Sequence, residues 1–181
     1  MKANITIMSG DGVGPEITRE AVKALQAIET SFGHDFTLEE VLFGGIAIDE
    51  TGSPYPEETQ RSCKSSDAVL LGAVGGPKWS DPNMKVRPEK EGLLAMRADL
   101  GIYANIRPIK TYPQLIENSP IKNRYLDNID MVFVRELTGG IYFGKKEKTE
   151  SSASDICEYS KTEIERITRV AANIAQGRRK K

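Results

Sequence analysis

The feature that most constrains the fold is an alternation of strand-like and helix-like segments that starts at the first residues of the chain. Residues 5–8 form a short apolar strand pattern, and the turn GDGVGPE follows at residues 10–16. Pro15 in that turn suits the first position of a helix, where its missing N–H would have no partner anyway. A second strand is expected over residues 36–43. Between them, apolar residues at helical spacing predict a helix whose buried face is made by Ile17, Ala21, Ala24, Leu25 and Ile28.

An unbroken apolar run, AVLLGAV at residues 68–74, lacks the alternation of a strand with one solvent face. Such a run is expected of a strand that is covered on both faces. Before it lie a turn-rich connection, residues 44–58, and a short polar helix, residues 57–64. Strand, helix and strand in this order imply right-handed crossovers. We therefore predict an α/β fold with a largely parallel sheet and flanking helices.

The middle of the chain contains a long segment rich in Gly and Pro, residues 74–91. Loops of this length inside compact domains are usually functional or disordered. Its tryptophan, Trp79, is unusual for an exposed loop, so it either caps a site or packs on a neighbour. A helix is expected over residues 91–100. Alternating apolar residues then predict a half-buried strand over residues 102–107, which Pro108 ends.

The C-terminal part is expected to hold a buried strand at residues 131–135, after an irregular region. A tight turn at residues 138–140 leads into a further strand at residues 141–143. The charged, Ser-rich residues 145–154 form an exposed excursion. The last helix has two candidate capping boxes, Ser160 with Glu163 and Thr162 with Glu165.

Composition excludes several classes of protein. The chain has 25 Lys+Arg and 26 Asp+Glu, and this balance argues against nucleic-acid binding, which normally needs a basic excess. No apolar run approaches the roughly 20 residues needed to cross a bilayer. Cys63 and Cys157 form no CxxC motif, which fits a reducing compartment such as the cytoplasm. The single histidine, His34, argues against a Ser-His-Asp triad or a multi-histidine metal site.

Three arginines lie at or near the ends of expected elements, which is where ligand sites collect in α/β proteins: Arg97, Arg107 and Arg135. Guanidinium groups bind carboxylates through two parallel hydrogen bonds, so three of them would suit a dicarboxylate. The alternative is three surface arginines in weak salt bridges. Spacing alone leaves both interpretations open.

Other residues near these arginines also carry two interpretations. Leu93 and Leu94 precede Arg97 by about one helical turn, so this helix either offers an apolar pocket beside a cation or is an ordinary amphipathic helix. Tyr142 is either a strand aromatic or a general acid, a role that tyrosine can fill where cations stabilise its anion. The GDGVGPE turn is either a tight connection or an anion-binding helix start.

Six motifs follow one another along the chain, and together they are more informative than any one of them: GDGVGPE, FGGIAIDETGSPYP, LLGAVGGPKW, RPEKEGLLAMR, YANIRP and RELTGGIYFG. Together they resemble the isocitrate/isopropylmalate dehydrogenase family of NAD-dependent, decarboxylating enzymes. RELTGGIYFG and GLLAMR resemble the version that acts on 3-isopropylmalate in leucine biosynthesis. The resemblance implies oxidation by NAD and loss of CO₂ with the help of Mg²⁺ or Mn²⁺, giving 2-oxoisocaproate.

The resemblance also implies roles for single residues. Arg97, Arg107 and Arg135 would bind the substrate carboxylates, with Leu93 and Leu94 facing the isopropyl group. Tyr142 would be the catalytic residue that protonates the enolate left by decarboxylation. The cofactor-binding residues would be Val13, Gly75, Gly76, Pro77, Lys78, Trp79 and Glu89. One extra residue before Gly92 leaves open whether Glu89 or Glu91 takes the family's glutamate position.

The family's two-domain fold implies a cofactor-side part at residues 1–100 and a substrate and dimerisation part at residues 101–181. An arm at residues 145–160 would contact the partner in a homodimer. Because family members are about twice this length, we expect a truncated chain, with the catalytic lysine and the metal-binding aspartates beyond residue 181. The alternative function is a non-catalytic remnant that binds a partner subunit or an anionic ligand.

Overall fold

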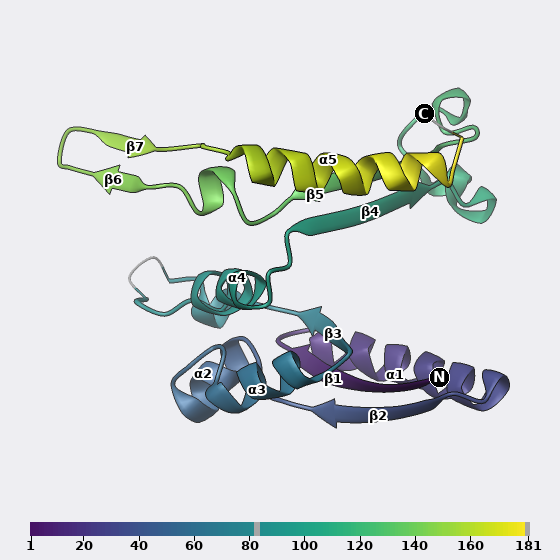
Figure 1. Ribbon diagram of the computed structural model, residues 1–181, viewed down its shortest axis with the longest axis horizontal. Helices are drawn as coiled ribbons and strands as arrows, with labels where there is room; N and C mark the ends of the chain where they lie inside the picture. Colours follow the sequence, from purple (N-terminus) through teal and green to yellow (C-terminus); the bar gives the residue numbers. More distant parts are fainter. Residues whose placement is uncertain (82–83, 180–181) are drawn as a thin grey trace. The chain divides into compact units, whose positions relative to one another are not determined.

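The computed structural model describes residues 1–81 and 84–179, and the chain divides into two compact units, Met1–Leu100 and Gly101–Lys181. The first unit contains a parallel three-stranded sheet in the order β2-β1-β3 (Figure 1). Its strands are β1 (Lys2–Gly10), β2 (Asp35–Glu40) and β3 (Ala68–Ala73). In the register, Ile5 of β1 lies opposite Leu38 on one side and Ala68 on the other. The predicted parallel sheet is therefore confirmed.

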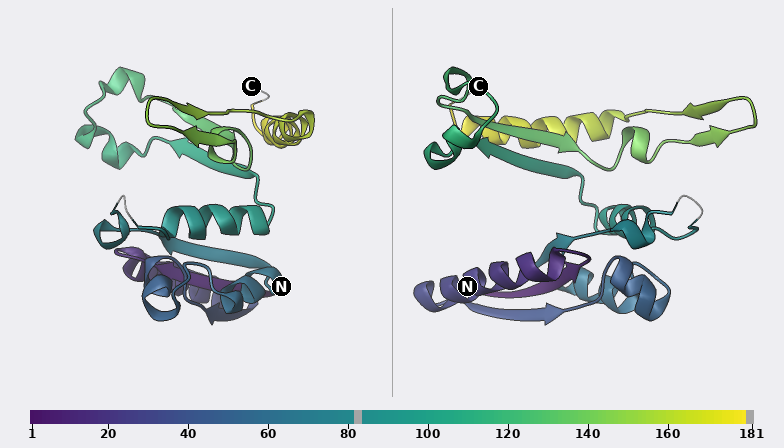
Figure 2. Two further views of the ribbon diagram at one scale, coloured as in Figure 1. Left: turned by 90° about the vertical axis from the view of Figure 1, so that its left-hand side faces the viewer. Right: turned by 180° about the vertical axis from the view of Figure 1, so that it is seen from behind.

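Both faces of this sheet are covered, as the alternation of side chains along β1 requires. Ile5 and Ile7 pack with residues of α1 (Gly14–Phe32), which lies along the sheet (Figure 2). Met8 points to the opposite face, where it packs with Phe43 and Met96. The apolar run in β3 likewise contributes to both clusters, as its lack of alternation predicts.

The predicted buried face of α1 is confirmed only in part. Leu25 packs on the sheet as predicted, together with Val22, whereas Ile17 is 46% exposed and Ile28 is 41% exposed. The start of the helix sets this rotation, because a Cβ on Gly14 would overlap the carbonyl oxygen of Ser9. Because Gly14 lies this close to β1, the side of α1 that carries Val22 and Leu25 faces the strands, and Ile17 and Ile28 remain exposed.

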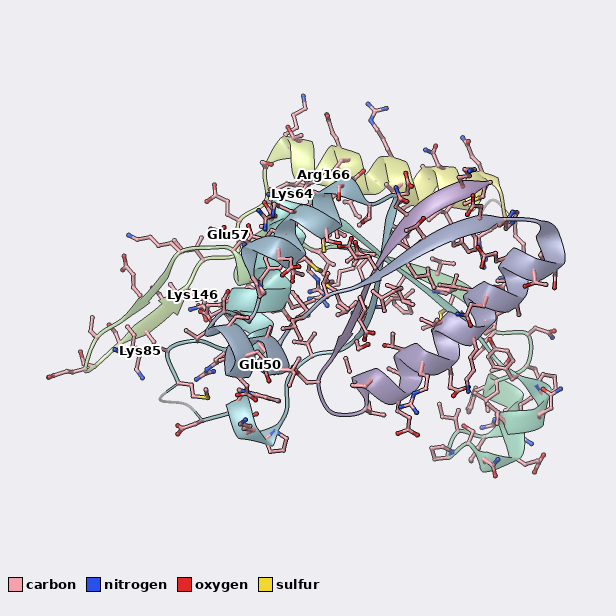
Figure 3. The ribbon with its side chains drawn as sticks, turned by 90° about the horizontal axis from the view of Figure 1, so that it is seen from below. Glu50, Glu57, Lys64, Lys85, Lys146 and Arg166 are labelled. Carbon is pink, nitrogen blue, oxygen red and sulfur yellow. The ribbon has the colours of Figure 1, made fainter. Side chains whose placement is uncertain are left out.

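Two short helices follow β2, namely α2 (Gly45–Thr51) and α3 (Glu57–Ser65). The turn-rich connection predicted over residues 44–58 contains a helix, α2, that the sequence pattern did not indicate. The helix starts with two glycines, and a side chain from another part of the chain binds its first N–H groups, as described below. In α3, acidic Glu57 lies in the first turn and Lys64 in the last (Figure 3), which suits the helix dipole.

The long Gly- and Pro-rich segment contains one 3₁₀ turn, η1 (Pro77–Trp79). The expected helix after it begins three residues early, as η2 (Pro88–Leu94), which has π-type hydrogen bonding, and continues as α4 (Ala95–Asp99). Proline at the first helical position explains this earlier start.

The second unit is built on two antiparallel strands, β4 (Ala104–Lys110) and β5 (Asp130–Glu136). The prediction that Pro108 ends the first strand is wrong, since Pro108 pairs with Val132 inside it. Proline is tolerated where a strand lies at a sheet edge. The strand predicted at residues 131–135 is confirmed as part of β5, but it is not a buried strand, because Met131 and Phe133 are exposed. The segment between the strands holds two 3₁₀ turns, η3 (Pro113–Asn118) and η4 (Asn123–Tyr125).

Residues 141–143 do not form the expected strand, because Gly140–Tyr142 is a 3₁₀ turn, η5. Gly140 has φ +68°, and a Cβ there would overlap the Tyr159 side chain, so the chain bends at this point. The excursion at residues 145–154 is an exposed hairpin of β6 (Lys146–Lys148) and β7 (Ala153–Asp155). Helix α5 (Lys161–Gln176) then lies along β5 (Figure 1), and its capping box is the one between Ser160 and Glu163.

Candidate functional site

One buried carboxylate joins three loops at the carboxyl ends of β1 and β3. Asp11 is only 3% exposed, and its Oδ2 accepts hydrogen bonds from the backbone N–H groups of Gly45 (2.7 Å) and Gly75 (2.8 Å). Its Oδ1 accepts a third from Ile46 at 2.8 Å. The carboxylate therefore binds the start of α2 and the loop after β3 at the same time.

This cluster lies where ligands bind in open α/β sheets. The connection after β1 leads to β2 on one side, while β3 lies on the other side of β1. The crevice at such a reversal of strand order is the usual binding place. Gly10 allows the approach, since it has φ +72° and a Cβ there would overlap the carbonyl oxygen of Ala73.

Trp79 packs on a neighbour, which was one of the two alternatives for it. Its ring lies against Gly45, where any Cβ would overlap the indole. Asp49 of α2 accepts a hydrogen bond from Trp79 Nε1 (3.4 Å) and pairs with Lys78 Nζ (2.6 Å). The hydrogen bond from Lys78 holds the pKa of the Asp49 carboxyl below its usual value. The 3₁₀ turn η1 in the loop after β3 is thereby attached to α2.

The two glutamates that the sequence left as alternatives have different surroundings. Glu89 is exposed, and its carboxylate lies against Gly75 in the loop after β3. The two are so close that a Cβ on Gly75 would overlap the carboxylate. Glu91 instead accepts a hydrogen bond from the backbone N–H of Arg87 (2.8 Å), at the start of η2. Of the two, only Glu89 directs its carboxylate at the proposed cofactor loop.

The other proposed cofactor residues have accessible surface. Val13 is exposed at the start of α1, and a Cβ on the adjacent Gly12 would meet no atom within 4 Å. Pro77 and Lys78 are exposed, and Gly76 is half-buried. Residues 82–83 of the same loop lie outside the described residues.

Leu93, Leu94 and Arg97 lie on consecutive turns of η2 and α4, and all three are half-buried. Leu93 packs against the core cluster that contains Phe43 and Met96. It is therefore partly a core residue, in line with the amphipathic-helix interpretation. A substrate contact for its remaining surface stays a prediction.

The register of the second sheet brings two of the three arginines together. Asn105 lies opposite Arg135, so the two share a face, and Arg107 is two residues further along β4 on that same face. The guanidinium of Arg107 donates to the side-chain oxygen of Asn105. Arg97 belongs to the other unit, so the convergence of all three arginines stays a prediction.

Tyr142 is exposed, and its ring lies under the guanidinium of Arg135 at 5.2 Å. A cation over an aromatic face is attracted by the ring's quadrupole. Arg135 is thus held beside a hydroxyl-bearing ring.

A partly buried ion pair braces the turn that carries Tyr142. Arg166 of α5 donates to both carboxylate oxygens of Glu136, at 2.9 and 3.1 Å, and to Thr138 Oγ1 at 2.6 Å. Its guanidinium also lies over the ring of Tyr103 at 4.5 Å. Burial acts to raise the pKa of Glu136, but the hydrogen bonds from Arg166 and Thr138 hold it below its usual value.

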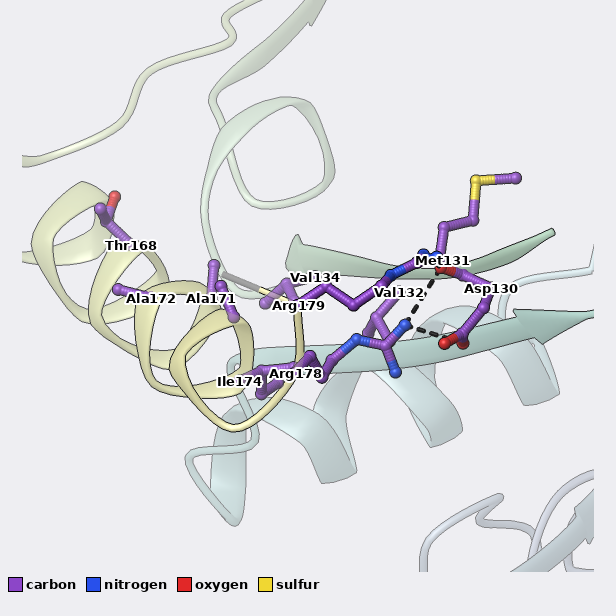
Figure 4. A pocket seen from close by; sticks show the side chains of 11 residues that line it. Asp130, Met131, Val132, Val134, Thr168, Ala171, Ala172, Ile174, Arg178 and Arg179 are labelled. Atoms are coloured by element: carbon purple, nitrogen blue, oxygen red, sulfur yellow. Dashed lines mark hydrogen bonds and ion pairs between the residues drawn. The ribbon is translucent and has the colours of Figure 1, made fainter. Parts of the chain in front are cut away.

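A cavity of about 600 Å³ lies between β5 and α5 (Figure 4). Val132 and Val134 line it, and they alternate with Arg135 along β5, so the cavity is on the face opposite the arginines. At its polar end Arg178 binds Asp130 Oδ1 at 2.7 Å, and this hydrogen bond lowers the pKa of Asp130. This apolar space is separate from the candidate carboxylate site.

The sequence interpretation missed Asp11, Glu136 and Arg166. The GDG turn offered a signal for Asp11, because an acid between glycines can come close to other backbones, and GG pairs recur at residues 44–45 and 75–76. Glu136 follows Arg135 directly, and its partner lies 30 residues away, so no local pattern indicated the pair.

Comparisons with known proteins identify the family of the chain. The family model described as isocitrate/isopropylmalate dehydrogenase matches residues 4–181. The chain is 55% identical to the 3-isopropylmalate dehydrogenase of Bacillus caldotenax, over 98% of this chain and 49% of the relative, and 47% identical to that of Bacillus subtilis, over 100% and 51%. It therefore spans about half the length of the curated relatives it matches.

Solved structures show the same fold. A β-decarboxylating dehydrogenase from Thermococcus kodakarensis matches with a TM-score of 0.69 and 30% identity, over 96% of this chain and 46% of that one. An isocitrate dehydrogenase from Methylococcus capsulatus matches with a TM-score of 0.77 and 26% identity, over 96% and 47%. With a family match over nearly all its residues and the expected α/β fold, the chain belongs to the isocitrate/isopropylmalate dehydrogenase family.

Proposed function

We propose that this chain serves the NAD-dependent oxidative decarboxylation of 3-isopropylmalate to 2-oxoisocaproate, a step of leucine biosynthesis. The observation that carries the proposal is the register of β4 and β5. It places Arg107 and Arg135 on one face, with Tyr142 against Arg135. Two arginines on one face, one of them beside a phenol, suit a substrate with two carboxylates that needs a proton donor.

The proposed site residues divide into those that bind the substrate and one that donates a proton. Arg107 and Arg135, with Arg97, bind the substrate carboxylates, since charge-assisted hydrogen bonds to carboxylates are strong and directional. Leu93 and Leu94 contact the isopropyl group. Tyr142 donates its hydroxyl proton to the carbon from which CO₂ has left, as a general acid. Arg135 orients the Tyr142 ring for this transfer.

The first unit is the proposed cofactor side, and its residues fit a nicotinamide nucleotide. The switch point between β1 and β3 offers the uncovered backbone of Gly12, the exposed Val13 and the loop at Gly75–Gly76. The remaining proposed contacts are Pro77, Lys78, Trp79 and Glu89. NAD, when bound, supplies the hydride acceptor.

A divalent metal belongs to the proposed reaction, but this part of the chain does not fit one. The described residues contain no group of three or more His, Cys, Asp or Glu side chains that could hold a metal ion. No step is therefore assigned to Mg²⁺ or Mn²⁺ through residues of this chain.

The proposed function also includes a homodimer and a cytoplasmic location. The second unit is the proposed substrate and dimerisation part, and the arm at residues 145–160, which contains the exposed β6–β7 hairpin, contacts a second copy. Both cysteines are free, which supports a reducing compartment such as the cytoplasm. No helix among the described residues is long and apolar enough to span a membrane.

The test measures NADH formation and ligand binding with the purified chain. The purified chain is mixed with NAD⁺, Mg²⁺ and either 3-isopropylmalate or isocitrate. Binding of each acid to the chain is measured by calorimetry. A preference for 3-isopropylmalate supports the assignment, and a preference for isocitrate contradicts it. Arg135→Ala should weaken binding about tenfold or more, because it removes a charge-assisted hydrogen bond.

Two further variants sharpen this test. Tyr142→Phe keeps the ring under Arg135, so it should bind the acid nearly as well as the parent chain while losing the proton donor. Lys23→Ala, at an exposed position of α1 that is assigned no contact with substrate, cofactor or partner, is the control and should change neither property.

The arginine-bearing face of β4 and β5 also supports a second candidate, a non-catalytic chain that binds an anionic ligand or a partner subunit. Arg107 is exposed and could bind a carboxylate without any reaction. Binding of 3-isopropylmalate without NADH formation, lost in Arg107→Ala, would favour this candidate for the isolated chain.

A further inference from the structure

Helix α2 and the loop after β3 are joined at two points. At the base of the loop, Asp11 binds the N–H of Gly75 and the N–H groups of Gly45 and Ile46. At the η1 turn, Asp49 holds Lys78 and Trp79. Between these points the Trp79 ring covers Gly45.

We infer that Asp11 is a positioning residue that fixes the loop at residues 75–79 on α2, with Asp49 as a weaker second attachment. The inference deepens the proposed function, on which it rests for the cofactor role of this loop. Asp11 itself touches backbone groups, so its effect on a bound cofactor acts through the loop. It also makes α2, to which no role was assigned, part of the cofactor side.

The chemistry of the carboxylate explains why Asp11 should hold the loop on α2 more strongly than Asp49 does. A carboxylate only accepts hydrogen bonds, and three N–H groups converge on its two oxygens. Buried N–H groups that lose their acceptor destabilise the arrangement that buries them. Asp49 pairs with Lys78, whose side chain is largely exposed, and exposed ion pairs contribute little. Loss of Asp11 should therefore release the loop far more than loss of Asp49.

Trp79 is the single tryptophan of the chain, so under native conditions its fluorescence reports on the surroundings of this loop. In Asp11→Ala, we expect Trp79 emission at longer wavelength and stronger quenching by acrylamide, since the ring leaves Gly45 for water. Asp49→Ala should show a smaller change in the same direction. The control is Thr6→Val, which removes a buried hydrogen bond to Ser62 (2.7 Å) and should lower stability without changing Trp79 emission.

Asp11→Asn gives a second test that keeps the side-chain shape. An amide can keep its oxygen at the Oδ2 position, which preserves the bonds to Gly45 and Gly75, and its NH₂ group then faces the N–H of Ile46. Hydrogen exchange of the Ile46 amide should become faster, while those of Gly45 and Gly75 stay protected. This readout decides the matter if Asp11→Ala does not fold.

Calorimetric titration with NAD⁺ separates this inference from the proposed function. We expect Asp11→Ala to bind NAD⁺ about tenfold more weakly than the parent chain. If the parent chain binds no NAD⁺ but Asp11→Ala still moves Trp79, the loop positioning stands and the cofactor role fails. A folded Asp11→Ala with parental Trp79 emission, or an Asp11→Asn with parental Ile46 exchange, overturns the inference.

Discussion

Replacing Arg166 by alanine should lower the free energy of unfolding of the second unit by about 3–5 kcal/mol, because it leaves a buried carboxylate without its cation. The Glu136 side chain is 7% exposed, against 31% for Arg166. Glu136→Gln should therefore cost less, about 1–3 kcal/mol, because the arginine it leaves behind can reach water. Urea unfolding followed by circular dichroism, with hydrogen exchange of α5 and β5, measures both changes.

The pH dependence of the two proteins should run in opposite directions. In the parent chain the pKa of Glu136 lies below its ordinary value of 4.5, so its stabilising contribution is present above that value and is lost as pH falls through the lowered pKa. In Arg166→Ala, burial without a partner raises the pKa of Glu136. The defect of the variant should then shrink as pH falls from neutrality toward 4.5, since protonation removes the buried charge.

The control for Arg166 is on the same helix. Lys161 pairs with Glu165 at 3.7 Å on the exposed side of α5, and Lys161→Ala should change stability by at most about 1 kcal/mol. An Arg166→Ala variant no less stable than Lys161→Ala would show that the ion pair between Arg166 and Glu136 does not brace the Tyr142 turn.

Replacing Phe43 by alanine should have a comparable effect in the first unit, about 3–5 kcal/mol of unfolding free energy. Phe43 is fully buried at 0% exposure, and its ring meets that of Tyr55 edge-on at 5.7 Å. The same cluster supports Leu93 and Met96, so the cavity would also loosen the helix that carries Arg97. Unfolding followed by Trp79 fluorescence reports on this unit.

The matched control is Phe32→Ala, at the exposed end of α1. Phe32 is one of the most exposed apolar residues of the chain, so its loss should change stability by less than about 0.5 kcal/mol. Equal effects of the two phenylalanine substitutions would contradict the assignment of the core to Phe43.

The parts of the fold that the sequence predicted correctly depend on local patterns. The apolar run of β3, the Pro15 start of α1 and the capping box at Ser160 each act within a few residues. The failures arise where distant residues decide the outcome. Helix α2 starts with glycines, and the acceptor for its first N–H groups is Asp11, 34 residues earlier.

The candidate site shows the same division. Arg107, Arg135 and Tyr142 were recognisable from residue type and motif. That Arg107 and Arg135 share one face follows from the strand register, which the sequence does not display. The bend that puts Tyr142 under Arg135 depends on Tyr159, which occupies the space beside Gly140. The two residues are separated in sequence by the β6–β7 hairpin, so no local pattern indicates their contact.

The two sheets also differ in how far apart along the chain their paired strands lie, and this bears on the order of folding. β1 and β3 pair across about sixty intervening residues, with the whole of β2 between them, whereas β4 and β5 are neighbours in sequence. Contacts between distant residues form slowly, because the entropy of closing a long loop is lost before any contact compensates for it. Refolding from denaturant should therefore show protection of the β4–β5 amides before those of β1 and β3. The half of the chain proposed to hold the substrate would form ahead of the half proposed to hold the cofactor.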